Sequence, residues 1–292
     1  MKRFKILIPV FNDWESLEKL LNEINIIIRE YKNMEFSGLI IDDASVTEKN
    51  EFKVPSNFKS IEVIKMKQNQ GHARCIAFGL KYLSSRTNFD YSILMDGDGE
   101  DRPEELKLLI NKALNIKDKS VVAKRVKRSE GFIFRSMYEI HKILTLFFTG
   151  KKINFGNYSC LTKNDVITLS DKKSLWSSFS GSVKKHINEI YSINSIRGKR
   201  YFGPSKMSLF KLIIHSFSII AVFKETVFLR SVFAIILLFF LDFKFSLVLF
   251  PIIQILLVIF CLLIFVISKR ESLNALNNSH KNKKETFIHK PQ

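Results

Sequence analysis

The chain has few cysteines and a shortage of acidic residues, and each shortage narrows the possible functions. Its 292 residues include three cysteines, Cys75, Cys160 and Cys261, which lie far apart and form no Cys-x-x-Cys pair. This argues against a disulfide framework or a zinc site and indicates a reducing compartment for the catalytic part. The 28 acidic residues face 46 lysines and arginines, so the net charge is +18. Such a chain favours a polyanionic partner: nucleic acid, anionic lipid or a phosphorylated substrate.

Other absences narrow the choice further. The chain contains no internal repeat and no recognised nucleic-acid-binding module, which argues against nucleic acid as the partner. Its first apolar run is too short for a secretory signal, contains Pro9 and passes directly into Asn12-Asp13. We therefore interpret this run as a first strand.

The chain does contain a repeated order of apolar run, polar turn and helical periodicity. This order is typical of an α/β fold with a doubly wound, mostly parallel sheet, and the length suits one large domain or one domain plus an appendage. The predicted strands cover 4–10, 38–41, 61–66, 91–95, 121–123 and 155–161. The predicted helices cover 14–31, 72–83, 104–114, 137–148 and 164–169.

An acidic turn follows the predicted strand 91–95. Asp96, Asp98 and Glu100 alternate along an extended segment, so their carboxylates can project to one side. Carboxylates held that close repel one another, and a hard divalent cation is the usual counter-charge. The turn therefore predicts a divalent metal, Mg²⁺ or Mn²⁺, held by Asp96, Asp98 and Glu100.

A second acidic turn, Asp42-Asp43, follows another predicted strand. Right-handed crossovers bring the ends of parallel strands to one edge of a sheet, where ligands of such folds bind. Two acidic turns on one edge would form an electronegative crevice without a local cation. This pattern predicts a metal that bridges to a bound diphosphate.

The C-terminal third of the chain is much more apolar. In segment 207–225 an apolar stripe lies beside Lys211, His215 and Lys224, which is typical of a helix in a membrane interface, although a buried core helix would show the same pattern. The region 226–268 then contains two apolar segments, about 227–242 and 247–267.

The second apolar segment has 21 residues without a charge, and a span needs roughly 20 apolar residues. The first spans as well if Arg230 snorkels to the interface. Two spans separated by the polar break Asp242–Lys244 are the preferred interpretation, and one span behind a buried helix is the alternative. The two helices also offer a surface on which protomers of a homo-oligomer could pack.

The segment 269–292 is predicted to be a basic tail. Its charged residues are Lys269, Arg270, Lys281, Lys283, Lys284 and Lys290 against Glu271 and Glu285. The positive-inside rule places such a tail in the cytoplasm, and two spans would put the large domain 1–206 on the same side. We therefore expect a multi-pass membrane protein with a cytoplasmic catalytic domain, whose basic charge serves lipid and phosphate.

Five motifs, taken in order, resemble inverting family-2 glycosyltransferases of the GT-A fold, and most of all the polyprenyl-phosphate (dolichyl-phosphate) sugar transferases. They are Ile8–Asp13, Ile41–Ser45, Asn69–Gly71 with Ala73, Met95–Glu104 and Arg197–Lys206. The likeness covers about residues 4–225 and includes the interfacial helix and the membrane segments after it. The order of the five motifs is specific, whereas no single motif is.

The resemblance implies roles for the matched residues. Those that match contacts to the nucleotide are Pro9, Phe11, Asp13, Ile41, Asp43, Asp96 and Gly97. Asp98 matches the second Asp of the Asp-x-Asp pair, and Glu100 stands where relatives often have a Gln metal ligand. Those that match positions gripping the acceptor phosphate and the donor diphosphate are Arg125, Arg135, Arg200, Ser205 and Lys206, and we expect Asp98, Arg125, Arg200 and Lys206 to carry the catalysis. Guanidinium groups suit phosphate oxygens bidentately, and Lys adds a mobile charge.

Three positions depart from the family pattern. Asp13 stands where Glu is more common, and Ala44 replaces the usual Gly of its turn, which predicts a tighter loop or different dihedral angles there. Phe155-Gly-Asn-Tyr-Ser159 stands where relatives read Gly-Asp-Phe-Arg. This segment either lines the sugar pocket or forms a core strand with Tyr158 packed inside, so it leaves the identity of the donor open.

The resemblance implies transfer of a sugar, with inversion, from a nucleotide-sugar donor to a polyprenyl phosphate for assembly of a cell-envelope glycan or glycolipid. A phosphate monoester is already anionic and needs no general base. This agrees with the histidines, since His72 begins a helix and His141 and His186 have no evident partner in the sequence.

Two alternatives stay open. A transferase of the same fold could add a sugar to a hydroxyl of a lipid-linked glycan, but it would need a carboxylate base, and the sequence shows none beyond the acidic turn. A catalytically inactive, membrane-anchored scaffold that binds nucleotide sugars is the alternative of another class. A processive polysaccharide synthase fits less well, because the chain contains no Gln-x-x-Arg-Trp segment and too few spans.

Overall fold

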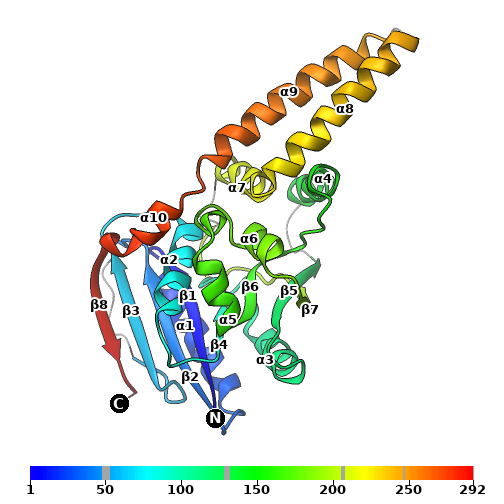
Figure 1. Ribbon diagram of the computed structural model, residues 1–292. Coiled ribbons are helices and arrows are strands. Elements are labelled where there is room, and N and C mark those ends of the chain that lie inside the picture. Colours follow the sequence, from blue (N-terminus) through cyan, green and yellow to red (C-terminus); the bar gives the residue numbers. More distant parts are fainter. Residues whose placement is uncertain (48–52, 128–131, 205–207, 246, 292) are drawn as a thin grey trace.

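The computed structural model shows an eight-stranded sheet, helices on both of its faces and a helical hairpin that projects from one end (Figure 1). The structure describes residues 1–47, 53–127, 132–204, 208–245 and 247–291. The strand order is β7-β5-β6-β4-β1-β2-β3-β8. Strands β1, β2, β3 and β4 run parallel to one another, β5 and β7 are parallel, and β6 and β8 pair antiparallel with their neighbours. The predicted mostly parallel α/β sheet is therefore confirmed.

The elements follow the predicted order closely in the first 170 residues. The strands are β1 Lys2–Val10, β2 Met34–Asp42, β3 Ser60–Met66, β4 Tyr91–Leu94, β5 Ser120–Lys127, β6 Phe155–Thr162, β7 Ile190–Ile196 and β8 Lys283–His289. The α-helices are α1 Trp14–Ile28, α2 His72–Ser84, α3 Leu106–Asn115, α4 Phe132–Thr149, α5 Lys163–Ser170, α6 Phe179–His186, α7 Leu209–Ala221, α8 Lys224–Phe245, α9 Leu249–Ser268 and α10 Leu273–Asn277. Short 3₁₀ turns occur at Pro103–Glu105, Lys173–Trp176 and Ser279–Asn282.

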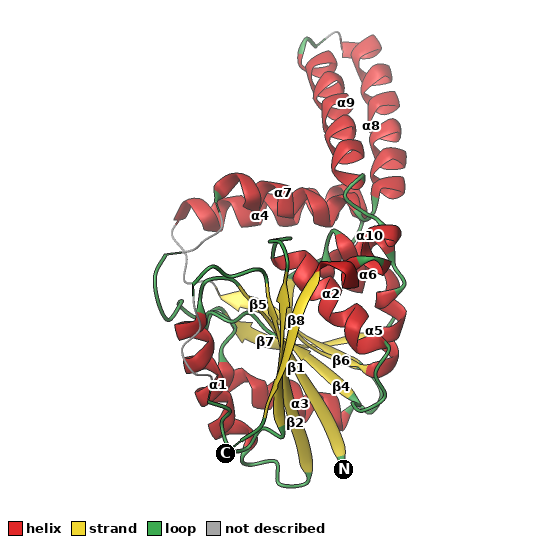
Figure 2. Cartoon of the chain, turned by 90° about the vertical axis from the view of Figure 1, so that its left-hand side faces the viewer, coloured by secondary structure: helices red, strands yellow, loops and turns green. Residues whose placement is uncertain are grey.

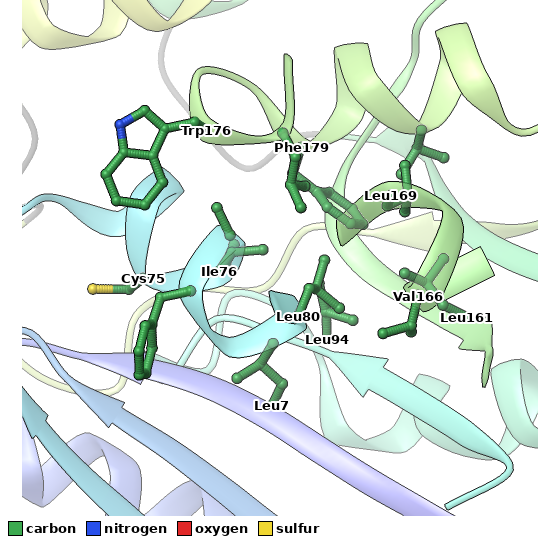
Figure 3. Packing of buried hydrophobic residues seen from close by; sticks show 14 of the residues in the cluster. Leu7, Cys75, Ile76, Leu80, Leu94, Leu161, Val166, Leu169, Trp176 and Phe179 are labelled. Atoms are coloured by element: carbon green, nitrogen blue, oxygen red, sulfur yellow. The ribbon is translucent and has the colours of Figure 1, made fainter. Parts of the chain in front are cut away.

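Two hydrophobic cores lie on opposite faces of the sheet. Side chains alternate along a strand, so Leu7 of β1 belongs to one core while its neighbours Ile6 and Ile8 belong to the other. In Figure 3, Leu7 and Leu94 of the sheet meet Ile76 and Leu80 of α2. Fully burying one such side chain contributes about 1.5–3 kcal/mol, so the sheet edge that carries the polar turns is built on a rigid base.

The segment predicted to be a basic tail is part of the sheet, and this prediction was wrong. After α9 the chain forms α10, and β8 then pairs antiparallel with β3, with Ile64 opposite Thr286. The turn before β8 is fixed as well, because Lys67 donates its backbone N–H to the Asn282 carbonyl at 2.7 Å. Charged residues are common on edge strands, where they discourage pairing with other chains. The basic composition of this segment therefore gave no indication that it contains the edge strand β8.

Helices α8 and α9 lie side by side in both overall views and form the hairpin (Figures 1 and 2). With 22 and 20 residues they are about 33 and 30 Å long, against a bilayer core of about 30 Å. Only 11% and 6% of their apolar stretches are buried, so both are long and apolar enough to cross a membrane. The polar break predicted at Asp242–Lys244 lies inside α8, which continues to Phe245.

Helices α4 and α7 lie between the sheet and the base of the hairpin (Figure 2). Apolar side chains of α4, namely Ile140, Ile143, Leu146 and Phe147, are exposed. Arg230 of α8 donates to the Phe147 carbonyl at 2.7 Å, so it caps the C-terminal end of α4 instead of only extending toward water. Gly150 (φ 68°) ends this turn, and a Cβ there would lie 2.6 Å from the Arg230 guanidinium.

Candidate active site

The acidic turn lies at the carboxyl end of β4, on the edge of the sheet that faces α4 and α7. β1 starts at the N-terminus, far from the hairpin, and runs toward it, and β4 is parallel to β1 (Figure 1). Within the turn, the Asp96 N–H donates to Asp101 at 2.9 Å and the Glu100 N–H donates to Asp98 at 3.0 Å. The two carboxylates therefore order the turn that carries them.

Arginines from a distant segment neutralise this turn. Arg200 donates to both Asp98 and Asp13, and Arg197 pairs with Glu100. Backbone bonds join the same segments, with the Tyr201 N–H donating to the Asp98 carbonyl at 2.9 Å. The crevice is therefore not left without positive charge: Arg200, which the resemblance led us to expect here, lies at the turn, and Arg197 joins it. The fold supplies positive charge from residues about one hundred positions away in the sequence.

Gly99 allows the segment with Arg197, Arg200 and Tyr201 to approach the acidic turn closely. Its φ is +84°, which favours glycine, and a Cβ at this position would lie 2.5 Å from the Tyr201 ring. Tyr201 in turn donates to Glu23 of α1. The arginine segment is thus fixed to the turn on one side and to a helix of the sheet domain on the other.

The surroundings shift the pKa values of the carboxyl groups of the turn in different directions. Burial works against the charge on Asp96, but His72 and Arg125 outweigh it and hold its pKa below the usual range. Burial and the neighbouring Asp96 charge raise the pKa of Asp98, and burial raises that of Asp101 to about 7. Burial also raises the pKa of Glu100. Additional positive charge at this place, from a metal ion, would therefore favour the ionised forms.

A histidine contacts the first Asp of the pair, which the sequence did not predict. His72 Nε2 lies 3.0 Å from Asp96 Oδ1, and the Asn157 amide nitrogen lies 3.1 Å from the same oxygen. The sequence placed His72 only at the start of a helix, and the fold brings it to the turn after β4 and to β6. Tyr158, next to Asn157, is buried, so β6 has one side chain in the core and the next one at the crevice.

Among the residues predicted to contact the nucleotide, Asp43 fixes a loop of the chain. Its two carboxylate oxygens accept the backbone N–H groups of Gln70 at 2.7 Å and Gly71 at 2.8 Å, and the residue is buried. Ala44, at the position where the resemblance led us to expect an unusual loop, has φ +61°. That conformation is strained for a non-glycine residue. The turn therefore keeps the left-handed backbone without the glycine.

The other predicted nucleotide contacts differ in exposure. Pro9 and Ile41 pair in the β1–β2 register, and both are buried. Phe11 is 38% exposed. Asp13 is held by Arg200.

The predicted phosphate-gripping residues are placed unequally. Arg125 lies 4.0 Å from Asp101, and a Cβ on Gly156 would come within 2.5 Å of its guanidinium. The structure thus brings Arg125 and Arg200 to the acidic turn. Ser205 and Lys206 lie outside the described residues, as does the side chain of Arg135.

Helix α7 reaches electrostatically into the same site. Burial, together with the positive charges of His72, His141 and Arg125, lowers the pKa of His215 to about 4. A pKa this low leaves His215 uncharged at neutral pH, on the helix that lies between the sheet and the base of the hairpin. The crevice and the base of the hairpin are adjacent parts of one structure.

The donor groups present fit a divalent metal that is completed by a substrate. Within the described ranges, no three His, Cys, Asp or Glu side chains converge on one point. Mg²⁺ is usually held by only one or two protein carboxylates together with substrate phosphates. Asp98, with Asp96 or Glu100, provides such oxygens on the edge of the sheet.

Sequence reasoning missed several residues of the site. Arg197 carried a signal, since it begins the Arg-x-x-Arg spacing, but no role was assigned to it. Asn157 lies in the Phe155–Ser159 segment, for which the resemblance left a sugar pocket and a core strand open. No role was assigned to Asp101 or His72, whose contacts with Asp96 appear only in the fold.

Comparison with known proteins finds curated relatives over most of the chain. Curated relatives include the undecaprenyl-phosphate 4-deoxy-4-formamido-L-arabinose transferases of Salmonella choleraesuis (strain SC-B67) and Salmonella newport (strain SL254). Each is 26% identical over 223 residues, which cover 73% of this chain and 65% of the relative. The chain thus spans slightly less than two thirds of the length of these relatives.

Solved structures show the same fold at low sequence identity. Glucosyl-3-phosphoglycerate synthase from Mycobacterium tuberculosis, in complex with Mn²⁺, UDP-glucose and phosphoglyceric acid, superposes with a TM-score of 0.54 at 13% identity, over 77% of this chain and 80% of that one. Mannosyl-3-phosphoglycerate synthase from Rubrobacter xylanophilus gives a TM-score of 0.52 at 12% identity, over 76% and 72%. The fold is thus the expected GT-A fold.

The family model described as glycosyl transferase family 2 matches residues 5–179. That region contains both acidic turns, His72, Arg125 and Asn157, and it excludes Arg197, Arg200 and the hairpin. By this match over more than half of its length, with the sheet and the acidic edge in place, the chain belongs to glycosyl transferase family 2.

Proposed function

We propose that the protein transfers a sugar from a nucleotide-sugar donor to a polyprenyl phosphate, with inversion, at a membrane surface. The observation that carries the proposal is the position of the Asp96–Asp98 turn. It lies beside Arg125 and Arg200 on the edge of the sheet that faces α4, α7 and the base of an apolar hairpin. Curated relatives named as undecaprenyl-phosphate sugar transferases support the same acceptor class.

Each region of the site has a task in this reaction. Phe11, together with the buried Pro9 and Ile41, would receive the nucleotide base. Arg125 and Arg200 would hold an anionic donor and an anionic acceptor close together, which requires fixed positive charge. A lipid-phosphate oxygen is already a nucleophile at neutral pH, so the chain needs no general base.

A divalent metal would be held by Asp98 together with Asp96 or Glu100. When bound, it would neutralise the negative charge of the departing nucleoside diphosphate. Arg200 donates to both Asp98 and Asp13, so its guanidinium would lie beside a metal held by Asp98.

The membrane topology is part of the proposal. Helices α8 and α9 would cross the bilayer as a hairpin, with α4 and α7 at the interface and the sheet in the cytoplasm. The pairing of β8 with β3 supports a hairpin that crosses the bilayer and returns, because both of its ends then lie on the same side as the sheet. The exposed apolar residues of α4 and Phe210 of α7, which is 71% exposed, are suited to the lipid surface.

The test uses membranes that contain the full chain. They are incubated with undecaprenyl phosphate and a panel of radiolabelled UDP-, GDP- and dTDP-sugars, and the lipid phase is counted. We expect one donor to give a labelled lipid and a chelator to abolish the signal. No labelled lipid with any donor would reject the proposal, and undiminished transfer in the presence of chelator would reject its metal.

A further inference from the structure

Three polar groups from three separate elements meet beside the acidic pair. His72 is the first residue of α2, Asn157 lies in β6 and Asp96 follows β4. His72 Nε2 is 3.0 Å from Asp96 Oδ1, Asn157 Nδ2 is 3.1 Å from the same oxygen, and the two nitrogens are 2.8 Å apart. All three residues keep part of their surface open, so a ligand can reach them.

His72, Asp96 and Asn157 form a triangle, and the neighbouring structure fixes each of the three. Leu94 pairs with Ser159 in the β4–β6 register, which continued by two residues puts Asn157 opposite Asp96. The adjacent Tyr158 is anchored in the core and donates to the Arg102 carbonyl at 3.0 Å. His72 follows Gly71, whose N–H is held by the buried Asp43. Because strand pairing, the buried Tyr158 and the buried Asp43 fix their positions, His72, Asp96 and Asn157 are held in this arrangement by the fold.

The triangle cannot satisfy its own hydrogen bonds. If His72 Nε2 carries a proton, it and the Asn157 amide are both donors, yet they face each other at 2.8 Å. If Nε2 carries none, Asn157 can donate to it, but its lone pair then faces the Asp96 carboxylate at 3.0 Å. In either state one of the three contacts is repulsive. A group that both donates and accepts would satisfy all three residues.

We propose that His72 and Asn157 bind a hydroxyl group of the donor sugar together with Asp96, and so select the sugar. The inference rests on the proposed nucleotide-sugar donor. A sugar hydroxyl can donate its proton to Asp96 and accept an N–H from Asn157 or His72, which is the pairing that the triangle lacks.

The position next to Arg125 fits a sugar attached to a diphosphate. Gly156 precedes Asn157, and a Cβ there would lie 2.5 Å from the Arg125 guanidinium. The glycine therefore lets the guanidinium come alongside the triangle. A sugar whose hydroxyl binds at the triangle would therefore carry its diphosphate close to the positive charge of Arg125.

The test compares two ligands that differ only in the sugar. Full-length Asn157→Ala and His72→Ala are purified in detergent and titrated by calorimetry with the nucleotide sugar that the wild type uses and with the matching nucleoside diphosphate. We expect about tenfold weaker binding of the nucleotide sugar, the scale of one hydrogen bond to a charged group, and unchanged binding of the diphosphate. His72→Gln, which keeps an N–H donor, is expected to restore part of the loss.

Steady-state kinetics and matched controls complete the design. The variants should raise the KM for the donor about tenfold and change kcat by less than threefold, because the hydroxyl is bound equally in the ground state and the transition state. Asn111→Ala and His280→Gln alter the same residue types away from the site and should change neither constant. UDP-glucose, GDP-mannose and dTDP-glucose serve as titrants if the wild type shows no turnover.

The outcomes separate this inference from the proposed function. Weaker binding of both ligands to the same degree would place the pair at the diphosphate and overturn the inference, as would unchanged binding of both. A wild type that binds nucleotide sugar but never labels the lipid would reject the acceptor in the proposed function and leave the selectivity of the triangle measurable. A wild type that binds no nucleotide sugar at all would reject both.

Discussion

The sheet domain and the helical hairpin are both rich in apolar residues, but the sheet domain buries these side chains whereas the hairpin exposes them. Phe4 and Ile6 of β1 are 1% and 0% exposed, whereas Phe233 and Phe240 of α8 are 70% and 65% exposed. In the sheet, apolar side chains leave the solvent by packing on helices. In the hairpin they remain outside, which is stable only where the surroundings are apolar. The same residue types thus indicate two different environments.

The candidate active site lies where these two regions meet. The chain enters the hairpin through α7 and leaves it through α10 and β8, so both connections return to the sheet domain. The acidic turn depends on the rigid sheet, and a lipid acceptor would come from the side of the hairpin. Substitutions in either region, or in a connection between them, should therefore differ in their effects on activity and stability.

The largest effect is expected from Asp98→Asn, on the sheet side of the site. We expect sugar transfer to fall roughly 10²–10³-fold, because a charge that stabilises the leaving group is lost. Stability should not fall, since burial and Asp96 already disfavour the charge on Asp98. Glu35→Gln, which alters an exposed ion pair with Lys59, is the control. Transfer within tenfold of wild type would contradict the role of Asp98.

A pair of identical substitutions compares the two regions directly. Leu7→Ala removes a fully buried side chain and should cost about 2–5 kcal/mol in the free energy of unfolding. Leu237→Ala removes one that is 50% exposed on α8 and should cost less than about 1 kcal/mol. Chemical unfolding of both variants in the same detergent gives the two values. Equal losses would show that the hairpin packs as a conventional core.

Deleting residues 283–292 cuts the second connection between the regions. The lost β8–β3 hydrogen bonds should cost about 2–3 kcal/mol, because each contributes about 0.5–1.5 kcal/mol and several are exposed. Limited proteolysis should then cleave near α10 faster than in wild type. Deletion of residues 290–292 alone leaves β8 intact and is the control. If both deletions behave alike, β8 does not stabilise the sheet.

Arg230→Leu tests the contact between the hairpin and α4. The Phe147 carbonyl would lose its donor at the negative end of the helix dipole, so we expect a loss of about 1–2 kcal/mol in thermal unfolding. Lys244→Leu changes the same charge at the other end of α8 and should have a smaller effect. A fully stable Arg230→Leu variant would mean that the capping bond adds nothing.

The smallest effect is expected from pH. The pKa of Asp101 is raised to about 7 in the folded state, so its folded form binds a proton that the unfolded form releases above about pH 4. Its contribution to stability is complete below pH 4 and is lost as pH rises through 7. Between pH 6 and 8 wild type should lose about 1 kcal/mol more than Asp101→Asn, whose amide oxygen can still accept the Asp96 N–H. Parallel pH profiles would contradict the raised pKa.

Local patterns of the sequence determined most of the sheet domain. The strands β1 to β6 and their helices were predicted because burial on one face imposes a period of two or of 3.6, which any short window shows. The acidic turn was recognised by residue type and spacing, whereas Arg125 was assigned a role only through the family resemblance. Two apolar helices of spanning length followed from composition alone.

Only the tertiary structure decided which distant residues meet. Arg200 and Asp13 are 187 positions apart, and His72, Asp96 and Asn157 come from three elements. β8 reads as a basic tail because most of its side chains are exposed, and its place is set by backbone bonds to β3 that carry no side-chain pattern. The pattern of apolar and polar residues in a sequence indicates which side chains of a local segment are buried and which are exposed. Pairing across a fold depends on strand order and register, which emerge only when the whole chain packs.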